Sequence, residues 1–76
     1  MIELGTKWID YLKNKPESGM GYQIVSIVLR NGIRYDQVVV DSGYITKIKG
    51  ITVISFTDED ILEIIVTHDK WDFGTD

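Results

Sequence analysis

The chain has no cysteine, one proline and one histidine among its 76 residues. The absence of cysteine excludes disulfide bonds, thiolate metal sites and a thiol nucleophile, and it fits a reducing compartment. Long apolar runs are also absent: the longest are Ile27–Leu29, Val38–Val40 and Ile64–Val66, whereas a membrane helix needs about 20 apolar residues. The charged N-terminus contains no apolar signal-peptide core. We therefore expect a cytoplasmic protein with no membrane segment.

The composition that remains is that of an ordinary globular protein. Hydrophobic residues make up 43% and charged residues 26% of the chain, which argues against disorder. The length predicts a single domain over residues 1–76, near the size at which one hydrophobic core is only marginally stable. Oligomerisation is a natural source of extra stability for so small a core, so a homodimer is compatible with the sequence.

The negative charge is concentrated at the C-terminal end. Residues 1–56 contain seven Lys or Arg and five Asp or Glu, whereas residues 57–76 contain seven acidic residues and one lysine. The predicted acidic face consists of Asp58, Glu59, Asp60, Glu63, Asp69 and Asp72. An acidic end argues against nucleic acid as a partner, because phosphate contacts need clustered cations. It either solvates the surface or meets a basic protein.

The stretch from Tyr22 to Val40 organises the chain. Two runs rich in β-branched residues flank Asn31-Gly32, and an Asn-Gly pair in this setting predicts a hairpin with a type I′ turn. The expected strands are 22–30 and 33–40. In this register Val28 lies opposite Tyr35, and Val25 lies opposite Val38.

Shorter elements surround this hairpin. Trp8 and Leu12 share one helical stripe with Leu4 and Tyr11, and Pro16 ends the pattern, so we predict a helix over about residues 6–14 with Thr6 as its N-cap. Further strands are expected over 44–48, 51–56 and 61–68, with a turn at Lys49-Gly50 and a single helical turn at Asp58 to Ile61 before the last strand. The tail, 69–76, carries Trp71 and Phe73 and is expected to be packed down.

The sum predicts a mainly β fold: an N-terminal α-helix followed by a five-stranded antiparallel meander that closes as an SH3-like small barrel. The alternative is an α+β fold in which one helix packs on an antiparallel sheet.

No arrangement of residues predicts catalysis, a metal site or a cofactor. His68 precedes Asp69, but adjacent strand residues point to opposite faces, which disfavours a His–Asp dyad. The acidic triplet Asp58 to Asp60 has neither the spacing nor the glycine of a calcium loop. We expect a protein that is not an enzyme and that holds no cofactor.

The aromatic residues offer the stronger hint of a binding surface. Most are needed to fill a small core, but Tyr35 and Tyr44, beside Arg34 and Lys47, are the residues we predict to bind a partner. The leading hypothesis is a small non-catalytic module that binds another protein. The second is an inhibitor or immunity-type protein whose acidic end blocks a basic site.

Two short segments support a third hypothesis. Ile48 to Val53 resembles the Ile-Arg-Gly-x-x-Val signature of Sm-like RNA-binding barrels, and Leu29 to Gly32 resembles the first turn of that family. The interval between the two segments is about one hairpin shorter than in the family. The resemblance implies a nucleic-acid-binding oligomer in which Arg30, Arg34, Lys47 and Lys49 would gather on one surface.

Overall fold

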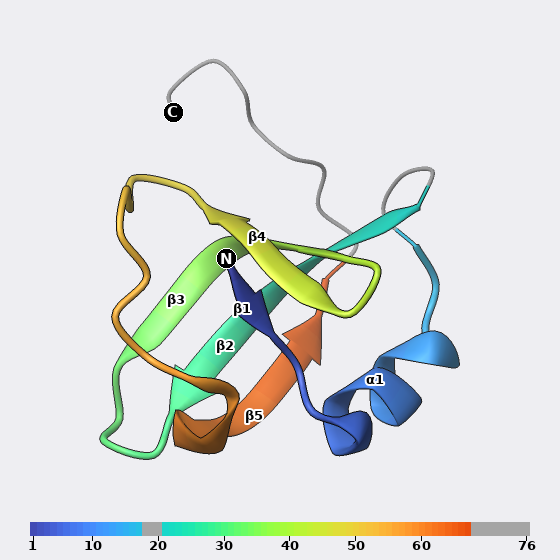
Figure 1. Cartoon of the computed structure of the whole chain (residues 1–76), viewed down its shortest axis with the longest axis horizontal. Coiled ribbons are helices and arrows are strands. Elements are labelled where there is room, and N and C mark those ends of the chain that lie inside the picture. Colours follow the sequence, from blue (N-terminus) through green and yellow to red (C-terminus); the bar gives the residue numbers. More distant parts are fainter. Residues whose placement is uncertain (18–20, 68–76) are drawn as a thin grey trace.

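The computed structural model describes residues 1–17 and 21–67, which form one curled antiparallel sheet with a short helix beside it (Figure 1). The elements are β1 (Ile2–Glu3), α1 (Thr6–Lys13), β2 (Tyr22–Leu29), β3 (Arg34–Asp41), β4 (Tyr44–Ile48), the 3-10 helix η1 (Asp58–Asp60) and β5 (Ile61–Val66). The five strands make a half-barrel in the order β1-β4-β3-β2-β5. The predicted mainly β fold, an N-terminal helix with a five-stranded antiparallel sheet, is therefore confirmed. The predicted packed tail, 69–76, lies outside the described residues.

One predicted strand does not form. Ile48 pairs with Ile51, as the Lys49-Gly50 turn requires, but residues 51–56 make no strand beyond this single bridge. Gly50 has a φ of 80° whereas Lys49 is not among the residues with positive φ. A turn with only its second central residue left-handed is of type II, which splays the two chains apart instead of matching their twist.

The strand order also differs from a continuous meander. β2, β3 and β4 do follow one another, but β5 crosses over to pair with β2, and β1 adds to β4. β1 was not expected, because two residues are too few to give a periodic pattern. β2 therefore has a neighbouring strand on each side, and six of its eight residues are buried. This explains why its sequence does not alternate cleanly between polar and apolar residues.

The hairpin between β2 and β3 is present, but its turn is not of type I′. Gly32 has a φ of 92°, whereas Asn31 is not left-handed. Leu29 N–H donates to the Ile33 carbonyl at 2.8 Å, and Gly32 N–H donates to the Leu29 carbonyl at 2.9 Å. These bonds close a three-residue loop in which a type I turn is followed by a left-handed glycine. Val28 consequently lies opposite Arg34 instead of Tyr35.

A β-bulge restores the predicted register farther from the turn. Ser26 faces both Asp36 and Gln37, and Gln37 has a φ of 54°. The extra residue on β3 cancels the extra residue in the turn, so Val25 does lie opposite Val38.

The core fills the concave side of the sheet. Trp8 and Leu12 of α1 join it with 8% and 4% exposure, whereas Tyr11 is 41% exposed. Every strand except the short β1 contributes buried residues: Val25, Ile27, Leu29, Val38, Val40, Ile45, Ile48, Ile61 and Ile64. Gly5, not Thr6, is the N-cap of α1. At its other end Gln23 Nε2 lies 3.0 Å from the Leu12 carbonyl and so holds the last turn against β2.

Two hydrogen bonds hold the segment between β1 and α1 against later parts of the chain. Leu4 N–H donates to the Gly43 carbonyl at 2.8 Å, just after β1. Gly5 N–H donates to Asp58 Oδ2 at 3.0 Å, which links the start of α1 to η1. Because η1 leads directly into β5, the Asp58 carboxylate connects the segment after one edge strand to the segment before the other.

Candidate functional site

The structure separates the residues that we predicted to bind a partner. Arg34 and Tyr35 are neighbours on β3 and point to opposite faces of the sheet. Tyr35 packs against the core. Tyr44 pairs with Asp41 at the start of β4, and Lys47 lies opposite Val39 on the same strand.

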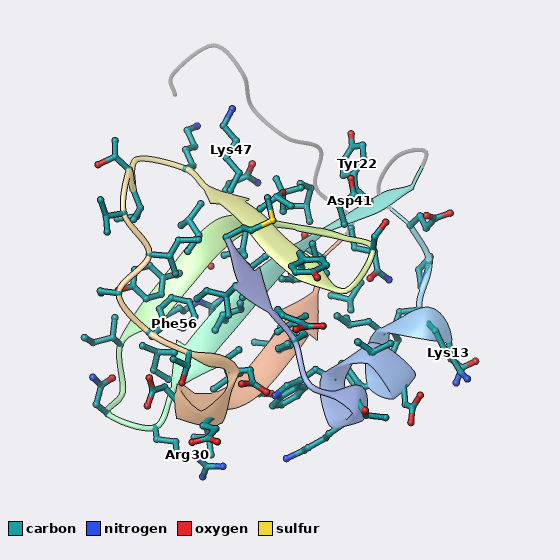
Figure 2. All side chains as sticks on the ribbon, viewed as in Figure 1. Lys13, Tyr22, Arg30, Asp41, Lys47 and Phe56 are labelled. Carbon is teal, nitrogen blue, oxygen red and sulfur yellow. The ribbon has the colours of Figure 1, made fainter. Side chains whose placement is uncertain are left out.

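The cations required by the Sm-like hypothesis are also spread out. Figure 2 shows Lys47 and Arg30 at opposite ends of the molecule in this view. Arg30 Nε donates to the Glu59 carbonyl at 3.1 Å, whereas Arg34 pairs with Asp36. Arg30 and Lys47 therefore do not lie together on one surface.

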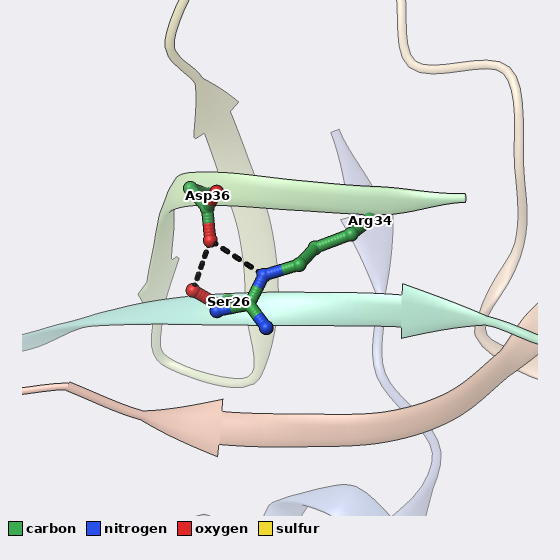
Figure 3. A network of polar contacts seen from close by, with 3 residues as sticks. All are labelled: Ser26, Arg34 and Asp36. Carbon is green, nitrogen blue, oxygen red and sulfur yellow. Dashed lines mark hydrogen bonds and ion pairs between the residues drawn. The ribbon is translucent and has the colours of Figure 1, made fainter. Parts of the chain in front are cut away.

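Arg34 belongs to a small polar network on the convex face (Figure 3). Asp36 Oδ1 accepts hydrogen bonds from Ser26 Oγ at 2.6 Å and from Arg34 Nε at 3.0 Å. The Ser26 hydrogen bond, and after it the bond from Arg34, holds the pKa of Asp36 below its usual value. Ser26 is only 3% exposed, so the carboxylate satisfies a buried hydroxyl beside the bulge. This arrangement holds the bulge at Gln37 in place.

A hollow at the tip of the β2–β3 hairpin carries Tyr35. Its ring stacks on Phe56, with the centroids 5.3 Å apart and the planes at 22°. A cavity of about 280 Å³ opens beside this pair. It is lined by Leu29, Arg30, Asn31, Ile33, Tyr35, Ser55, Phe56 and Asp60. We call this cavity the hairpin-tip hollow.

The walls of the hairpin-tip hollow are held together by hydrogen bonds across distant parts of the chain. Arg30 N–H donates to the Asp60 carbonyl at 2.8 Å, in addition to its side-chain bond to Glu59. Asn31 Oδ1 accepts the Ile33 N–H at 3.0 Å, which fixes the shape of the loop. The hairpin loop and the segment before β5 are thus joined into one surface.

Sequence reasoning found Tyr35 but not its partner. Phe56 was expected in a strand over 51–56, where its neighbour would have been set by strand pairing. Because that strand does not form, the chain crosses over the end of the sheet and brings Phe56, 6% exposed, under Tyr35. No local pattern in the sequence indicates this pair, because Tyr35 and Phe56 lie far apart in the chain.

Two residues of the acidic triplet accept hydrogen bonds from backbone N–H groups. Asp58 accepts the Gly5 N–H, and Asp60 Oδ2 accepts the Thr57 N–H at 3.0 Å to cap η1. Glu63 lies on β5, whereas Asp69 and Asp72 lie outside the described residues. In residues 1–17 and 21–67 no group of three His, Cys, Asp or Glu side chains is placed to hold a metal ion.

Comparison with protein-family models, with curated proteins and with solved structures finds no match to this chain. In the part of the chain that the structure describes, no helix has the length and apolar character needed to cross a membrane.

Proposed function

We propose that this protein is a small non-catalytic protein-interaction module that holds an extended segment of another protein in the hairpin-tip hollow. The observation that carries the proposal is the stacked Tyr35–Phe56 pair at the wall of that hollow. Grooves lined with aromatic side chains are how SH3-like barrels hold extended peptides, and we assign this module to that mode of recognition. The absence of cysteine supports a reducing, cytoplasmic setting.

The hollow offers an apolar surface next to polar groups. Ile33 is 48% exposed at its rim, so an apolar side chain of the peptide can bury it against the Tyr35 ring. The opposite charges of Arg30 and Asp60 line the same hollow and can orient the polar backbone of an extended peptide. A few polar groups placed around an apolar wall are typical of small binding sites.

The hollow is also preorganised. The hydrogen bond that Arg30 N–H donates to Asp60, and the one that Asn31 Oδ1 accepts from Ile33, fix the loop before any partner arrives. A rigid site loses less conformational entropy on binding, which favours affinity from a small contact area.

A peptide selection tests the proposal. The immobilised native protein is used to select binders from a random peptide library displayed on phage, and their affinity is measured by fluorescence anisotropy. We expect enriched peptides with large apolar side chains. We expect Ile33→Asp to lower the affinity of these peptides by about tenfold or more, because a central apolar contact contributes more than about 1 kcal/mol to binding.

Ile51→Asp is the matched control, because Ile51 is 39% exposed and does not line the hollow. It should leave the affinity unchanged. The proposal is wrong if no peptide is enriched over an empty support, or if Ile33→Asp binds as tightly as the native chain.

A further inference from the structure

β5 has one paired side and one outer side. Thr67 N–H donates to the Ile24 carbonyl at 3.2 Å, so Thr67 directs its backbone toward β2. Backbone direction alternates along an antiparallel strand. Glu63 and Ile65 therefore also face β2, and Ile64 and Val66 direct their N–H and carbonyl groups outward. Within residues 1–17 and 21–67, no strand pairs with this outer side.

The sequence of β5 carries none of the usual protection of an edge strand. Proteins blunt exposed edges with lysine, proline or very short strands. β5 is six residues long, reads Ile-Leu-Glu-Ile-Ile-Val, and has Glu63 as its one charge. An apolar, β-branched strand of this length is a ready template for another strand.

There is space beside the outer side of β5. A cavity of about 280 Å³ lies between β5 and the end of α1. It is lined by Tyr11, Lys15, Pro16, Glu63, Ile64, Ile65 and Val66. Tyr11 is 41% exposed and Lys15 Nζ lies 4.9 Å from the centroid of its ring, so an incoming strand would meet this aromatic side chain.

We propose that the occupant is a second copy of this chain, whose β5 adds antiparallel to β5 about a two-fold axis at Ile65. Two copies of the same patch related by a two-fold axis form a closed, self-complementary interface. The two five-stranded sheets would become continuous across the axis. This inference does not depend on the hairpin-tip hollow, which none of the residues beside β5 lines.

The register follows from the alternation of backbone groups. Outward-facing residues must pair with outward-facing residues, so Ile64 hydrogen-bonds with Val66 of the partner subunit and the reverse pair forms as well. Ile65 then lies opposite its own copy, and Glu63 lies opposite Thr67. Over residues 63–67, these pairs match apolar with apolar and polar with polar.

The neighbouring registers are less favourable. An axis at Glu63 would set two like charges directly opposite each other, which is destabilising in an antiparallel pair. An axis at Ile64 would place Glu63 against an isoleucine. The charge on β5 therefore selects the axis at Ile65, and it is the reason why a second copy fits this edge.

Opposite charges introduced at Ile65 test the interface. Sedimentation should give the native chain twice the mass of the 8.7 kDa protomer. We expect Ile65→Lys and Ile65→Glu each to shift the dissociation constant upward by about a hundredfold, because like charges would then meet on the axis. An equimolar mixture of the two variants should restore the dimer.

Because the chain has no cysteine, single cysteine substitutions report the register independently. Across a non-hydrogen-bonded pair the Cα atoms lie about 4.5 Å apart, which is within the range that a disulfide spans. Ile65→Cys should cross-link two chains under mild oxidation. Glu63→Cys is the matched control, because in the proposed register the two copies of residue 63 lie about 14 Å apart.

The outcomes decide the proposal. A dimer that dissociates in both charge variants, reforms in their mixture and cross-links through Ile65→Cys supports it. The proposal is overturned if the native chain is a monomer at all concentrations. It is also overturned if the dimer of each charge variant has the same dissociation constant as the native dimer. Cross-linking through Glu63→Cys but not Ile65→Cys overturns the register. If a charge variant fails to fold by circular dichroism, the two cysteine variants still decide.

Discussion

The two margins of the sheet differ in how they end. On one side β1 covers the first residues of β4 with only two residues of its own, and Lys47 and Lys49 follow along the same margin. On the other side β5 runs for six residues without lysine or proline. A short strand and lysines are devices that prevent pairing with another chain, whereas a long apolar strand invites it. The same sheet thus has one protected margin and one margin suited to association.

This contrast has a counterpart in the core. β5 buries Ile61 and Ile64 at 1% and 2% exposure, whereas Ile2 of β1 is only partly buried. The edge strand β5 therefore contributes more to the buried core than the edge strand β1 does.

The largest effect is expected at Ile64. Ile64→Ala should lower the free energy of unfolding by about 2–5 kcal/mol, because it empties a fully buried site. Ile2→Ala should cost less than about 2 kcal/mol, because the side chain is only partly covered and the site can relax. Urea unfolding followed by circular dichroism, at one fixed protein concentration, measures both. Equal losses in the two variants would remove the proposed difference between the margins.

The turn that supports the protected margin should come next. Gly43 has a φ of 84°, and a Cβ there would lie 3.1 Å from Ile9 Cδ1. Gly43→Ala should therefore lower the free energy of unfolding by more than the roughly 1–2 kcal/mol that a left-handed conformation costs a residue other than glycine.

Gly50→Ala is the control for Gly43→Ala, because its φ is 80° but no atom lies within 4 Å of the added Cβ. Gly50→Ala should lower the free energy of unfolding only by the cost of placing alanine in a left-handed conformation. If thermal unfolding finds Gly50→Ala equally or more destabilising, the contact with Ile9 has no role at this margin.

A smaller effect is expected at the contact between the two ends of the sheet. Asp58→Ala removes the acceptor of the Gly5 N–H and should cost about 1 kcal/mol. Asp58→Asn keeps an acceptor oxygen and should recover part of that loss. Urea unfolding of the two variants distinguishes them, and no difference between the native chain and Asp58→Ala would show that the hydrogen bond does not hold these segments together.

The smallest effect is expected from Asp36, which is largely exposed. Its pKa is lower in the folded chain, chiefly because Ser26 donates to it. Its contribution to stability is therefore complete above the unfolded pKa and is lost as the pH falls through the folded pKa.

An NMR titration of the Asp36 side chain checks the cause. The midpoint should rise toward the ordinary value in Ser26→Ala, and rise less in Arg34→Ala, because the Ser26 hydrogen bond is the larger of the two causes. An unchanged midpoint in Ser26→Ala would contradict this ranking.

The sequence predicted the elements whose signals are local. The helical stripe through Trp8 and Leu12 and the two strands around Asn31-Gly32 all form. These features depend on residue spacing and on the backbone freedom of glycine, both of which can be read from neighbouring residues.

The features that were missed depend on distant parts of the chain. Nothing local to Gln23 shows that its amide caps a helix that lies earlier in the chain. The bulge at Gln37 follows from an extra residue in the turn and from the Ser26–Asp36 bond. The Tyr35–Phe56 pair forms in a structure where residues 51–56 do not make the strand that we predicted. Of the residues that line the hairpin-tip hollow, the sequence therefore pointed to Tyr35 alone, and it did not predict how the hollow is built.

The most direct test of the difference between the margins is amide hydrogen exchange of the native chain at several protein concentrations. If β5 pairs with a second β5, the amides of Ile64 and Val66 exchange more slowly as the concentration rises, while the amide of Thr46 on the protected margin keeps a constant rate. Rates at Ile64 and Val66 that do not depend on concentration would contradict the account.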